Sequence, residues 1–164
     1  MIVLITGDFC VGKDVVADYF VENMDNAQKI LSYTTRKPRF EGEQTHLFCT
    51  KEEFEQFDDL IATTCINDEY YGARSEQFDT DMVNIYVVDN KGVSDVLNAH
   101  IDNVYVVEVV RPDWLKNCPK SRIDRNQVAD RDFKVSYRIM NDGDLDKLFR
   151  ICDDCLAFLQ KCAA

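Results

Sequence analysis

The sequence has no apolar stretch near the roughly 20 residues that a helix needs to cross a bilayer, and its N-terminus lacks the pattern of a secretory signal. Basic residues are scarce, because 19 lysines and arginines stand against 30 aspartates and glutamates, which gives a formal net charge of −11. Nucleic acid and anionic membranes repel such a chain at long range. We therefore expect neither as a partner, and we expect no targeting sequence before a first strand that begins at Ile2.

The cysteines lack the pattern of a disulfide framework or of a zinc site. Their number, seven, is odd, and they are scattered along the chain, which is typical of a protein in the reducing cytoplasm. Cys152 and Cys155 have the spacing of half a zinc site, but no second pair completes it. Because the two lie three residues apart on an expected C-terminal helix, we interpret them as buried thiols on one face.

The pattern of apolar runs indicates one α/β domain. At 164 residues the chain is long enough for a substantial core, and no repeat, low-complexity tract or linker divides it. The expected strands are 2–5, 29–33, 60–66, 84–88, 104–110 and 135–140, and the expected helices are 15–26, 51–57, 75–81, 92–100 and 145–161. This alternation predicts a parallel sheet with helices on both faces, whose ligands bind beyond the carboxyl ends of the strands.

The stretch from Gly7 to Lys13 has the form Gly-x-x-x-x-Gly-Lys and stands between the first strand and the first helix, which is the context that a phosphate loop needs. Glycines let backbone N–H groups turn toward phosphate oxygens, and the helix N-terminus adds partial positive charge. Lys13 is expected to reach the β- and γ-phosphates of a nucleotide. The sequence therefore predicts a P-loop NTPase-type sheet that binds the phosphates of a nucleotide through Gly7, Asp8, Phe9, Cys10, Val11, Gly12, Lys13, Asp14 and Val15.

Asp14 departs from the motif, because a serine or threonine hydroxyl normally ligates Mg²⁺ at this position. A carboxylate is also a hard oxygen ligand that suits Mg²⁺, although it brings negative charge close to the phosphates. Asp14 also suits the first turn of a helix without any metal, because the helix dipole favours an acidic side chain there. Both interpretations remain open at this point.

Six further stretches resemble the guanylate kinases, and together with the phosphate loop they span nearly the whole chain. They are Ser32-Tyr-Thr-Thr-Arg36-Lys-Pro-Arg39, Gly42-Glu43, Phe48-x-x-x-Glu-Glu-Phe54, Tyr70-Tyr71-Gly72, Val88-Asp89-x-x-Gly92 and the turn that begins Ile139-Met-Asn141-Asp-Gly. The resemblance implies a single kinase domain, 1–164, whose core comprises 1–31, 83–113 and 134–164. It also implies a nucleoside-monophosphate-binding insertion at 32–82 and a short lid at 114–133, where the chain is shorter than is typical of the family.

The resemblance also implies the roles of the residues that bind the acceptor. Arg36, Arg39 and Tyr71 would hold its monophosphate, since guanidinium groups bind phosphate in bidentate fashion. His46 stands where the family has another tyrosine, and it could donate to the phosphate as a cation near pH 6.5. It is equally well explained as an ordinary histidine of a surface loop. Ser32 and Asp89 match positions at or near the guanine.

One departure affects the choice of base. The family glutamate that reads the guanine edge aligns near Ala62, and a methyl group accepts no hydrogen bond. The hydroxyls of Thr63 and Thr64 are candidates to replace it, which would alter the base that is accepted. The sequence therefore predicts a monophosphate acceptor without fixing its base or sugar.

The resemblance places three lid arginines and one turn near ATP. Arg122, Arg125 and Arg131 would close over the transferring phosphate with Lys13 and act as catalytic residues. A salt-bridged surface helix is the other interpretation, because aspartates lie beside all three. Asn141 would lie beside the adenine.

These features together predict ATP-dependent phosphoryl transfer, with Mg²⁺, to a (deoxy)nucleoside monophosphate in the cytoplasm. Two alternatives remain open, a kinase of another phosphorylated small molecule or modified nucleotide and a non-catalytic guanylate-kinase-like binding module. Such modules tend to lose the phosphate loop, whereas Gly7, Gly12 and Lys13 are all present. The expected partners are nucleotide substrates, and the chain is expected to be a monomer or a homodimer.

Overall fold

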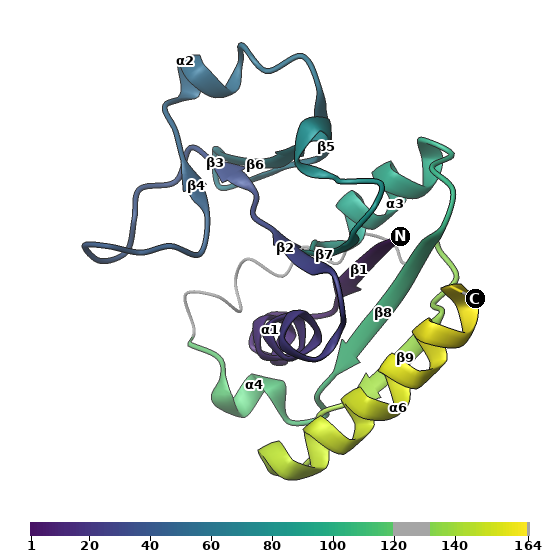
Figure 1. Ribbon diagram of the computed structural model, residues 1–164. Helices are drawn as coiled ribbons and strands as arrows, with labels where there is room; N and C mark the ends of the chain where they lie inside the picture. Colours follow the sequence, from purple (N-terminus) through teal and green to yellow (C-terminus); the bar gives the residue numbers. More distant parts are fainter. Residues whose placement is uncertain (120–131, 164) are drawn as a thin grey trace.

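The computed structural model describes residues 1–119 and 132–163. Its main sheet has five parallel strands in the order β2-β7-β1-β8-β9 (Figure 1). These strands are β1 (Ile2–Thr6), β2 (Ala27–Ile30), β7 (Val83–Val87), β8 (Val104–Val110) and β9 (Tyr137–Met140). The helices around them are α1 (Lys13–Asn23), α3 (Asn90–Asn98), α4 (Trp114–Asn117) and α6 (Leu145–Ala163).

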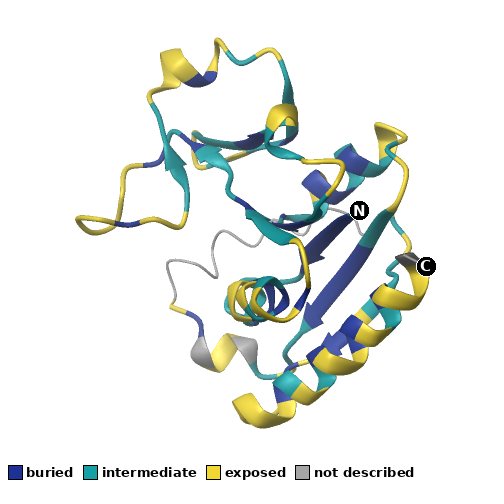
Figure 2. Cartoon of the chain, viewed as in Figure 1, coloured by how far each residue is buried: buried dark blue, intermediate teal, exposed yellow. Residues whose placement is uncertain are grey.

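Alternating side chains of the central strands form two cores, one on each face of the main sheet. On β1, Val3 and Ile5 pack with residues of α1 and α6, whereas Ile2 and Leu4 pack with residues of α3. β1 and most of β8 are accordingly dark blue in Figure 2. This arrangement confirms the predicted α/β fold with helices on both faces of a parallel sheet.

A second, smaller sheet lies beyond the end of the main one (Figure 1). Its strands, in the order β4-β3-β6-β5, are β3 (Tyr33–Thr34), β4 (Leu47–Phe48), β5 (Leu60–Ile66) and β6 (Glu69–Arg74). β6 pairs antiparallel with both β5 and β3, and all four strands come from residues 32–82. The expected single strand 29–33 is wrong, because β2 ends at Ile30 and the chain then enters the second sheet at Tyr33.

The short elements follow their capping residues. Thr50 and Glu53 form the expected capping box of α2 (Lys51–Phe54), and Asp144 accepts a hydrogen bond from the Lys147 amide at the start of α6. The helix expected at 75–81 is only the short 3₁₀ turn η1 (Ser75–Gln77). In the described part of the chain, no helix has the length and apolar character needed to cross a membrane.

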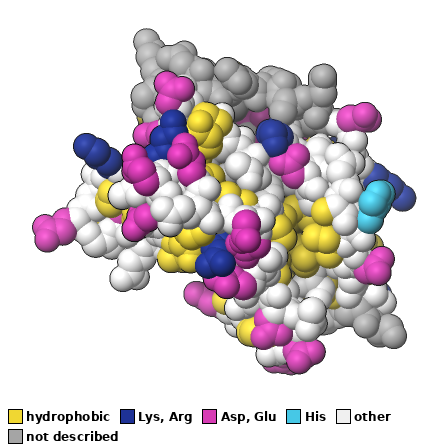
Figure 3. All heavy atoms as spheres, turned by 90° about the horizontal axis from the view of Figure 1, so that it is seen from above, with side chains coloured by type: hydrophobic (Ala, Val, Ile, Leu, Met, Phe, Trp, Pro, Cys, Tyr) yellow, Lys and Arg dark blue, Asp and Glu magenta, His cyan; other side chains and the backbone are white. Residues whose placement is uncertain are grey.

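The thiols and charges have the expected distribution. Cys152 and Cys155 are fully buried on α6, and burial raises the pKa of each to about 12, so they are buried thiols. No cysteine forms a disulfide. Acidic side chains are spread over the face shown in Figure 3, with lysines and arginines between them.

Candidate functional site

A cavity of about 950 Å³ opens where the carboxyl ends of β1, β2 and β7 face the second sheet. One side of it is formed by the phosphate loop and the first turn of α1. The other side is formed by the loop before β4 and by β5 and β6. Its polar and charged lining residues include Lys13, Asp14, Lys29, Ser32, Arg39, Thr45, His46, Thr64, Tyr71, Tyr86, Asp89, Asn90 and Lys91.

At both glycines of the phosphate loop, a residue with a Cβ atom would have a strained φ angle and a close contact with a neighbouring atom. Gly7 has φ 143°, and a Cβ on it would lie 2.2 Å from the carbonyl oxygen of Val109. Gly12 has φ 97°, and its Cβ would lie 2.8 Å from Nδ2 of Asn141. That Asn141 amide donates to the Val11 carbonyl at 2.8 Å. The loop therefore packs closely against β8, and Asn141, in the turn after β9, holds it through a hydrogen bond. Contact of Asn141 with adenine stays a prediction.

The ammonium group of Lys13 is hydrogen-bonded to the backbone of the phosphate loop. Its Nζ donates to the Gly7 carbonyl at 2.9 Å and to the Asp8 carbonyl at 2.7 Å, and it lies 5.6 Å from the centre of the Phe9 ring. Burial lowers the pKa of Lys13, while Asp14 and Asp8 oppose this shift through their negative charge. The side chain is therefore positioned at the phosphate loop before any nucleotide binds.

Asp14 lies in the first turn of α1, and its side chain is 75% exposed at the cavity wall. One of its oxygens lies 3.2 Å from Nζ of Lys29, which also contacts Asp18 at 2.7 Å. Hydrogen bonds and charges of these aspartates raise the pKa of Lys29 even though burial opposes the shift. The negative charge that Asp14 brings to the phosphate site is thus offset by a lysine that the sequence analysis did not single out.

Arg36 is buried and is not one of the residues that line the cavity. Its side chain is 5% exposed, and its two terminal nitrogens bind both oxygens of Glu43 at 3.1 and 2.8 Å, while that glutamate is itself 1% exposed. The Arg36 guanidinium holds the pKa of the Glu43 carboxyl far below its usual range. Among the described residues, Nε of Arg36 is a buried side-chain nitrogen without a hydrogen-bond partner. Direct binding of phosphate by Arg36 stays a prediction.

Glu43 also orders the residues that do face the cavity. It accepts a hydrogen bond from the Arg39 amide at 2.6 Å and one from the Thr45 hydroxyl at 2.6 Å. The Thr45 hydroxyl lies 2.9 Å from Nδ1 of His46, whose ring packs edge-on against Tyr71 with centroids 5.7 Å apart. Arg39, His46 and Tyr71 are therefore brought together on one wall, as the acceptor-phosphate hypothesis requires.

His46 differs from the expectation that it acts as a cation near pH 6.5. Burial and the neighbouring Arg36 lower its pKa, so the neutral imidazole is favoured at pH 7. The ring is half-buried and lines the cavity, which argues against an ordinary surface histidine. It can still donate one hydrogen bond to a phosphate oxygen.

Three further lining residues, Ser32, Tyr86 and Asp89, supply two hydroxyl groups and one carboxylate. Ser32 Oγ lies 2.9 Å from the hydroxyl of Tyr86, and burial raises the pKa of that tyrosine to about 12. Asp89 caps α3 by accepting a hydrogen bond from the Gly92 amide at 2.7 Å. Ser32 and Asp89 both line the cavity, so the two predicted base-contacting residues lie where they can act together.

β5 changes its pairing with β6 between Ile61 and Thr64, and this irregularity decides which hydroxyl faces the cavity. Ala62 is buried with φ 56° at this point, and it lines the cavity without a polar group. Thr64 also lines the cavity. Oγ1 of Thr63 lies near Gly72 on the other side of the strand, and its carbonyl accepts a hydrogen bond from Lys91 at 2.7 Å. Of the two candidate hydroxyls, only that of Thr64 therefore faces the cavity.

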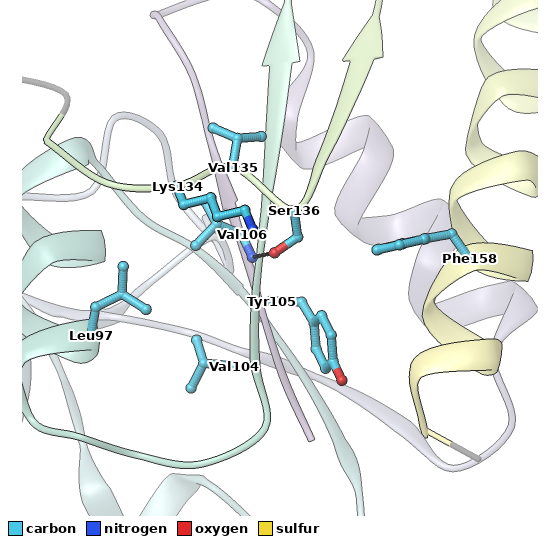
Figure 4. Close-up of a pocket in the computed structure, with 8 residues that line it drawn as sticks. All are labelled: Leu97, Val104, Tyr105, Val106, Lys134, Val135, Ser136 and Phe158. Atoms are coloured by element: carbon cyan, nitrogen blue, oxygen red, sulfur yellow. Dashed lines mark hydrogen bonds between the residues drawn. The ribbon is translucent and has the colours of Figure 1, made fainter.

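The lid arginines Arg122, Arg125 and Arg131 lie outside the described residues, so their role stays a prediction. A second cavity of about 500 Å³ lies near the start of β8, and Figure 4 shows its residues. Its walls are largely apolar, with Ser136 Oγ bonded to the Val106 amide at 3.1 Å. Because it lies toward the opposite end of the sheet from the phosphate loop, we place the functional site in the larger cavity.

Several residues of this site have no assigned role in the sequence motifs. Lys29, Tyr86 and Lys91 line the cavity, and Glu43 orders its wall. Lys29 is the one charged residue of the short strand β2, which is a weak sign of a role outside the core. Glu43 belongs to the stretch Gly42-Glu43 that resembles the guanylate kinases, but nothing in the local pattern indicates that it is buried and binds Arg36.

The sheet order β2-β7-β1-β8-β9, with the glycine loop leading from its central strand into α1, makes this chain an α/β protein of the P-loop NTPase type. Within that class its fold is that of a guanylate kinase. The crystal structure of guanylate kinase from Anaplasma phagocytophilum superposes with a TM-score of 0.73 over 98% of this chain and 85% of that one, at 19% sequence identity.

The amino-acid sequence supports the same relationship. A guanylate kinase of Clostridium perfringens is 25% identical over 185 residues, covering 99% of this chain and 84% of that protein. No family model matches the sequence. The chain is therefore guanylate-kinase-like in both sequence and fold, as its motifs predict.

Proposed function

We propose that this protein is a nucleoside monophosphate kinase, which transfers the γ-phosphoryl group of ATP to the phosphate of a (deoxy)nucleoside monophosphate and yields ADP and the diphosphate. The main support for the proposal is that one cavity has the phosphate loop with Lys13 on one side and Arg39, His46 and Tyr71 on the other. Similarity to guanylate kinases in sequence and fold supports the same reaction class.

In this proposal the chain acts by positioning and by electrostatic stabilisation, which is what phosphoryl transfer mainly requires. Lys13 and the loop amides hold the phosphates of ATP. Arg39, His46 and Tyr71 aim the acceptor phosphate, while Arg36 and Glu43 keep that wall rigid. No general base is needed, because a monophosphate already carries most of its negative charge near neutral pH. The lid arginines would stabilise the transferring group.

Asp14 is the proposed protein ligand of Mg²⁺, which neutralises phosphate charge when bound. An exposed carboxylate at the cavity wall fits a hard cation, and Mg²⁺ is usually held by one or two carboxylates together with substrate phosphates. In the described ranges, no three histidine, cysteine or acidic side chains form a complete protein cage for a metal. Lys29 would keep its contact with Asp18 when Asp14 turns to the ion.

Replacing the proposed metal ligand should change the dependence on Mg²⁺. We expect Asp14→Ala to raise the Mg²⁺ concentration for half-maximal turnover by about tenfold, or about 1.4 kcal/mol. Asp18→Ala is the matched control, because it removes the other partner of Lys29 from the same helix and should leave that concentration unchanged. Equal Mg²⁺ dependence of the two variants would leave Asp14 as a helix-end residue only.

The base is the finer part of the proposal. Ala62 offers no acceptor to a guanine edge, and Ser32, Thr64 and Asp89 are the polar groups that would contact a base instead. A panel of common ribo- and deoxyribonucleoside monophosphates, each with ATP and Mg²⁺, tests the proposal through ADP release. Turnover of at least one is expected. ATP binding without turnover of any would refute it in favour of another phosphorylated acceptor or a binding module.

The proposal also covers the cellular compartment and the partners of the protein. Seven cysteines without a disulfide suit a reducing cytoplasm, and the acidic surface disfavours nucleic acid and anionic membranes as partners. Its partners would then be its nucleotide substrates alone, with the chain acting as a monomer or a homodimer.

A further inference from the structure

Two thiols, one in the phosphate loop and one far from it in the sequence, lie in contact. Sγ of Cys10 lies 2.6 Å from Sγ of Cys118, although the residues are 108 positions apart. Cys10 is half-buried with φ 60° inside the loop, and Cys118 is buried directly after α4. Cys10 and Pro119 both line the large cavity, so the thiol pair lies at the wall where the phosphates of a nucleotide would bind.

The surroundings of Cys10 differ from those of the buried cysteines on α6. Burial raises the pKa of Cys152 and of Cys155 to about 12, which suppresses their reactive thiolate forms. Cys10 lines the cavity instead, as the exposed Cys65 also does, and the Cys10 sulfur contacts a second thiol, that of Cys118. An oxidant that enters the cavity and reaches Cys10 therefore meets two thiols in contact.

We propose that Cys10 and Cys118 form an oxidation site that closes to a disulfide across the phosphate loop. With hydrogen peroxide, the Cys10 thiolate attacks one oxygen, the O–O bond breaks, and hydroxide leaves while Cys10 becomes a sulfenic acid. The Cys118 thiol then attacks the Cys10 sulfur, the S–S bond forms, and water leaves. In total, two thiols are oxidised and one peroxide is reduced to two waters.

The disulfide would restrict the loop that must receive phosphate. Backbone N–H groups between Gly7 and Gly12 have to turn toward phosphate oxygens, and the bond would hold Cys118 and Pro119 against that loop. We expect the oxidised protein to bind MgATP about tenfold more weakly or worse. This effect on binding rests on the proposed function, whereas formation of the disulfide does not. In a reducing cytoplasm the bond would be transient and reversible by thiols.

The test uses the full chain, titrated with hydrogen peroxide and followed by thiol counting, peptide mapping and binding of a fluorescent ATP analogue. We expect free thiols to fall from seven to five, a cross-linked peptide containing Cys10 and Cys118, and weaker binding that dithiothreitol restores. Cys118→Ser should bind the analogue normally and keep its binding after oxidation. The double variant Cys65→Ser, Cys162→Ser removes the two exposed thiols and should still form the bond.

Each contrary result has a distinct meaning. Oxidation confined to Cys65 and Cys162, with Cys10 and Cys118 still reduced, would overturn the proposed site. A Cys10–Cys118 bond that leaves ATP binding unchanged would overturn its effect on the loop. Failure of the reduced protein to bind the ATP analogue would refute the proposed function and leave the oxidation site standing. If Cys118→Ser folds poorly, Cys118→Ala serves the same comparison.

Discussion

Lys13→Met is expected to lower kcat/KM for phosphoryl transfer by about 100- to 1,000-fold, the range seen when one preorganised electrostatic contact to a transition state is removed. The reason is local, because the Lys13 ammonium donates to the Gly7 and Asp8 carbonyls of the loop that we propose to bind the phosphates. Steady-state kinetics with ATP as the varied substrate measures the effect, and thermal unfolding checks that the variant is folded.

Lys161→Met is the matched control for this variant. Lys161 is an exposed lysine in the last turn of α6, so its loss should leave kcat/KM unchanged. If Lys13→Met retained turnover within about threefold of the wild type, the loop would not bind the transferring phosphates and the proposed mechanism would fail.

Glu43→Ala is expected to produce the largest loss of stability, about 3–5 kcal/mol. Removing one partner of a buried ion pair leaves the other charge buried and uncompensated, here Arg36. For a chain of this length, such a loss lowers Tm by roughly 10 °C. Glu55→Ala is the control, because it breaks the exposed pair with Lys51 at 4.0 Å and should cost less than about 1 kcal/mol. A Glu43→Ala variant as stable as Glu55→Ala would contradict this account of the wall.

The same carboxylate should make stability fall with acid. Because Arg36 lowers the pKa of Glu43 in the folded protein, its contribution is fully present above the unfolded value of about 4.3 and is lost as pH falls below it. The free energy of unfolding of the wild type should therefore decline more steeply between about pH 5 and about pH 3 than that of Glu43→Gln. Parallel curves for the two proteins would refute this assignment.

The phosphate loop could be predicted from sequence because its signals are local. Gly7, Gly12 and Lys13 follow a short apolar strand at the start of a helix. The two glycines have positive φ angles, and Lys13 donates to backbone carbonyls of the same loop. The strands β5 and β8 were also predicted at their observed bounds, since both are runs of apolar or β-branched residues, interrupted in β8 only by Glu108.

The construction of the acceptor wall could not be predicted, because it depends on contacts between loops. Nothing near Glu43 in the sequence indicates that it is buried or that it binds both Arg36 and the Arg39 amide. The choice between Thr63 and Thr64 likewise depends on an irregularity in strand pairing, which the alternation of side chains does not reveal.

The role of Lys29 also could not be predicted from the sequence. A lysine on a short strand is normally read as an exposed residue, and its contact with Asp14 becomes evident only when β2 lies beside α1. The departure at Asp14 was visible in the motif, but the residue that balances its charge was not.

Direct observation of the products tests the central claim most directly. With ATP, Mg²⁺ and the monophosphate that gives the fastest ADP release, ³¹P NMR distinguishes transfer to a phosphate acceptor from hydrolysis. We predict that the γ-phosphate signal of ATP disappears while ADP and the nucleoside diphosphate appear in equal amounts, without inorganic phosphate. Inorganic phosphate in place of the diphosphate, or no change in the ATP signals with any monophosphate, would contradict the proposed kinase.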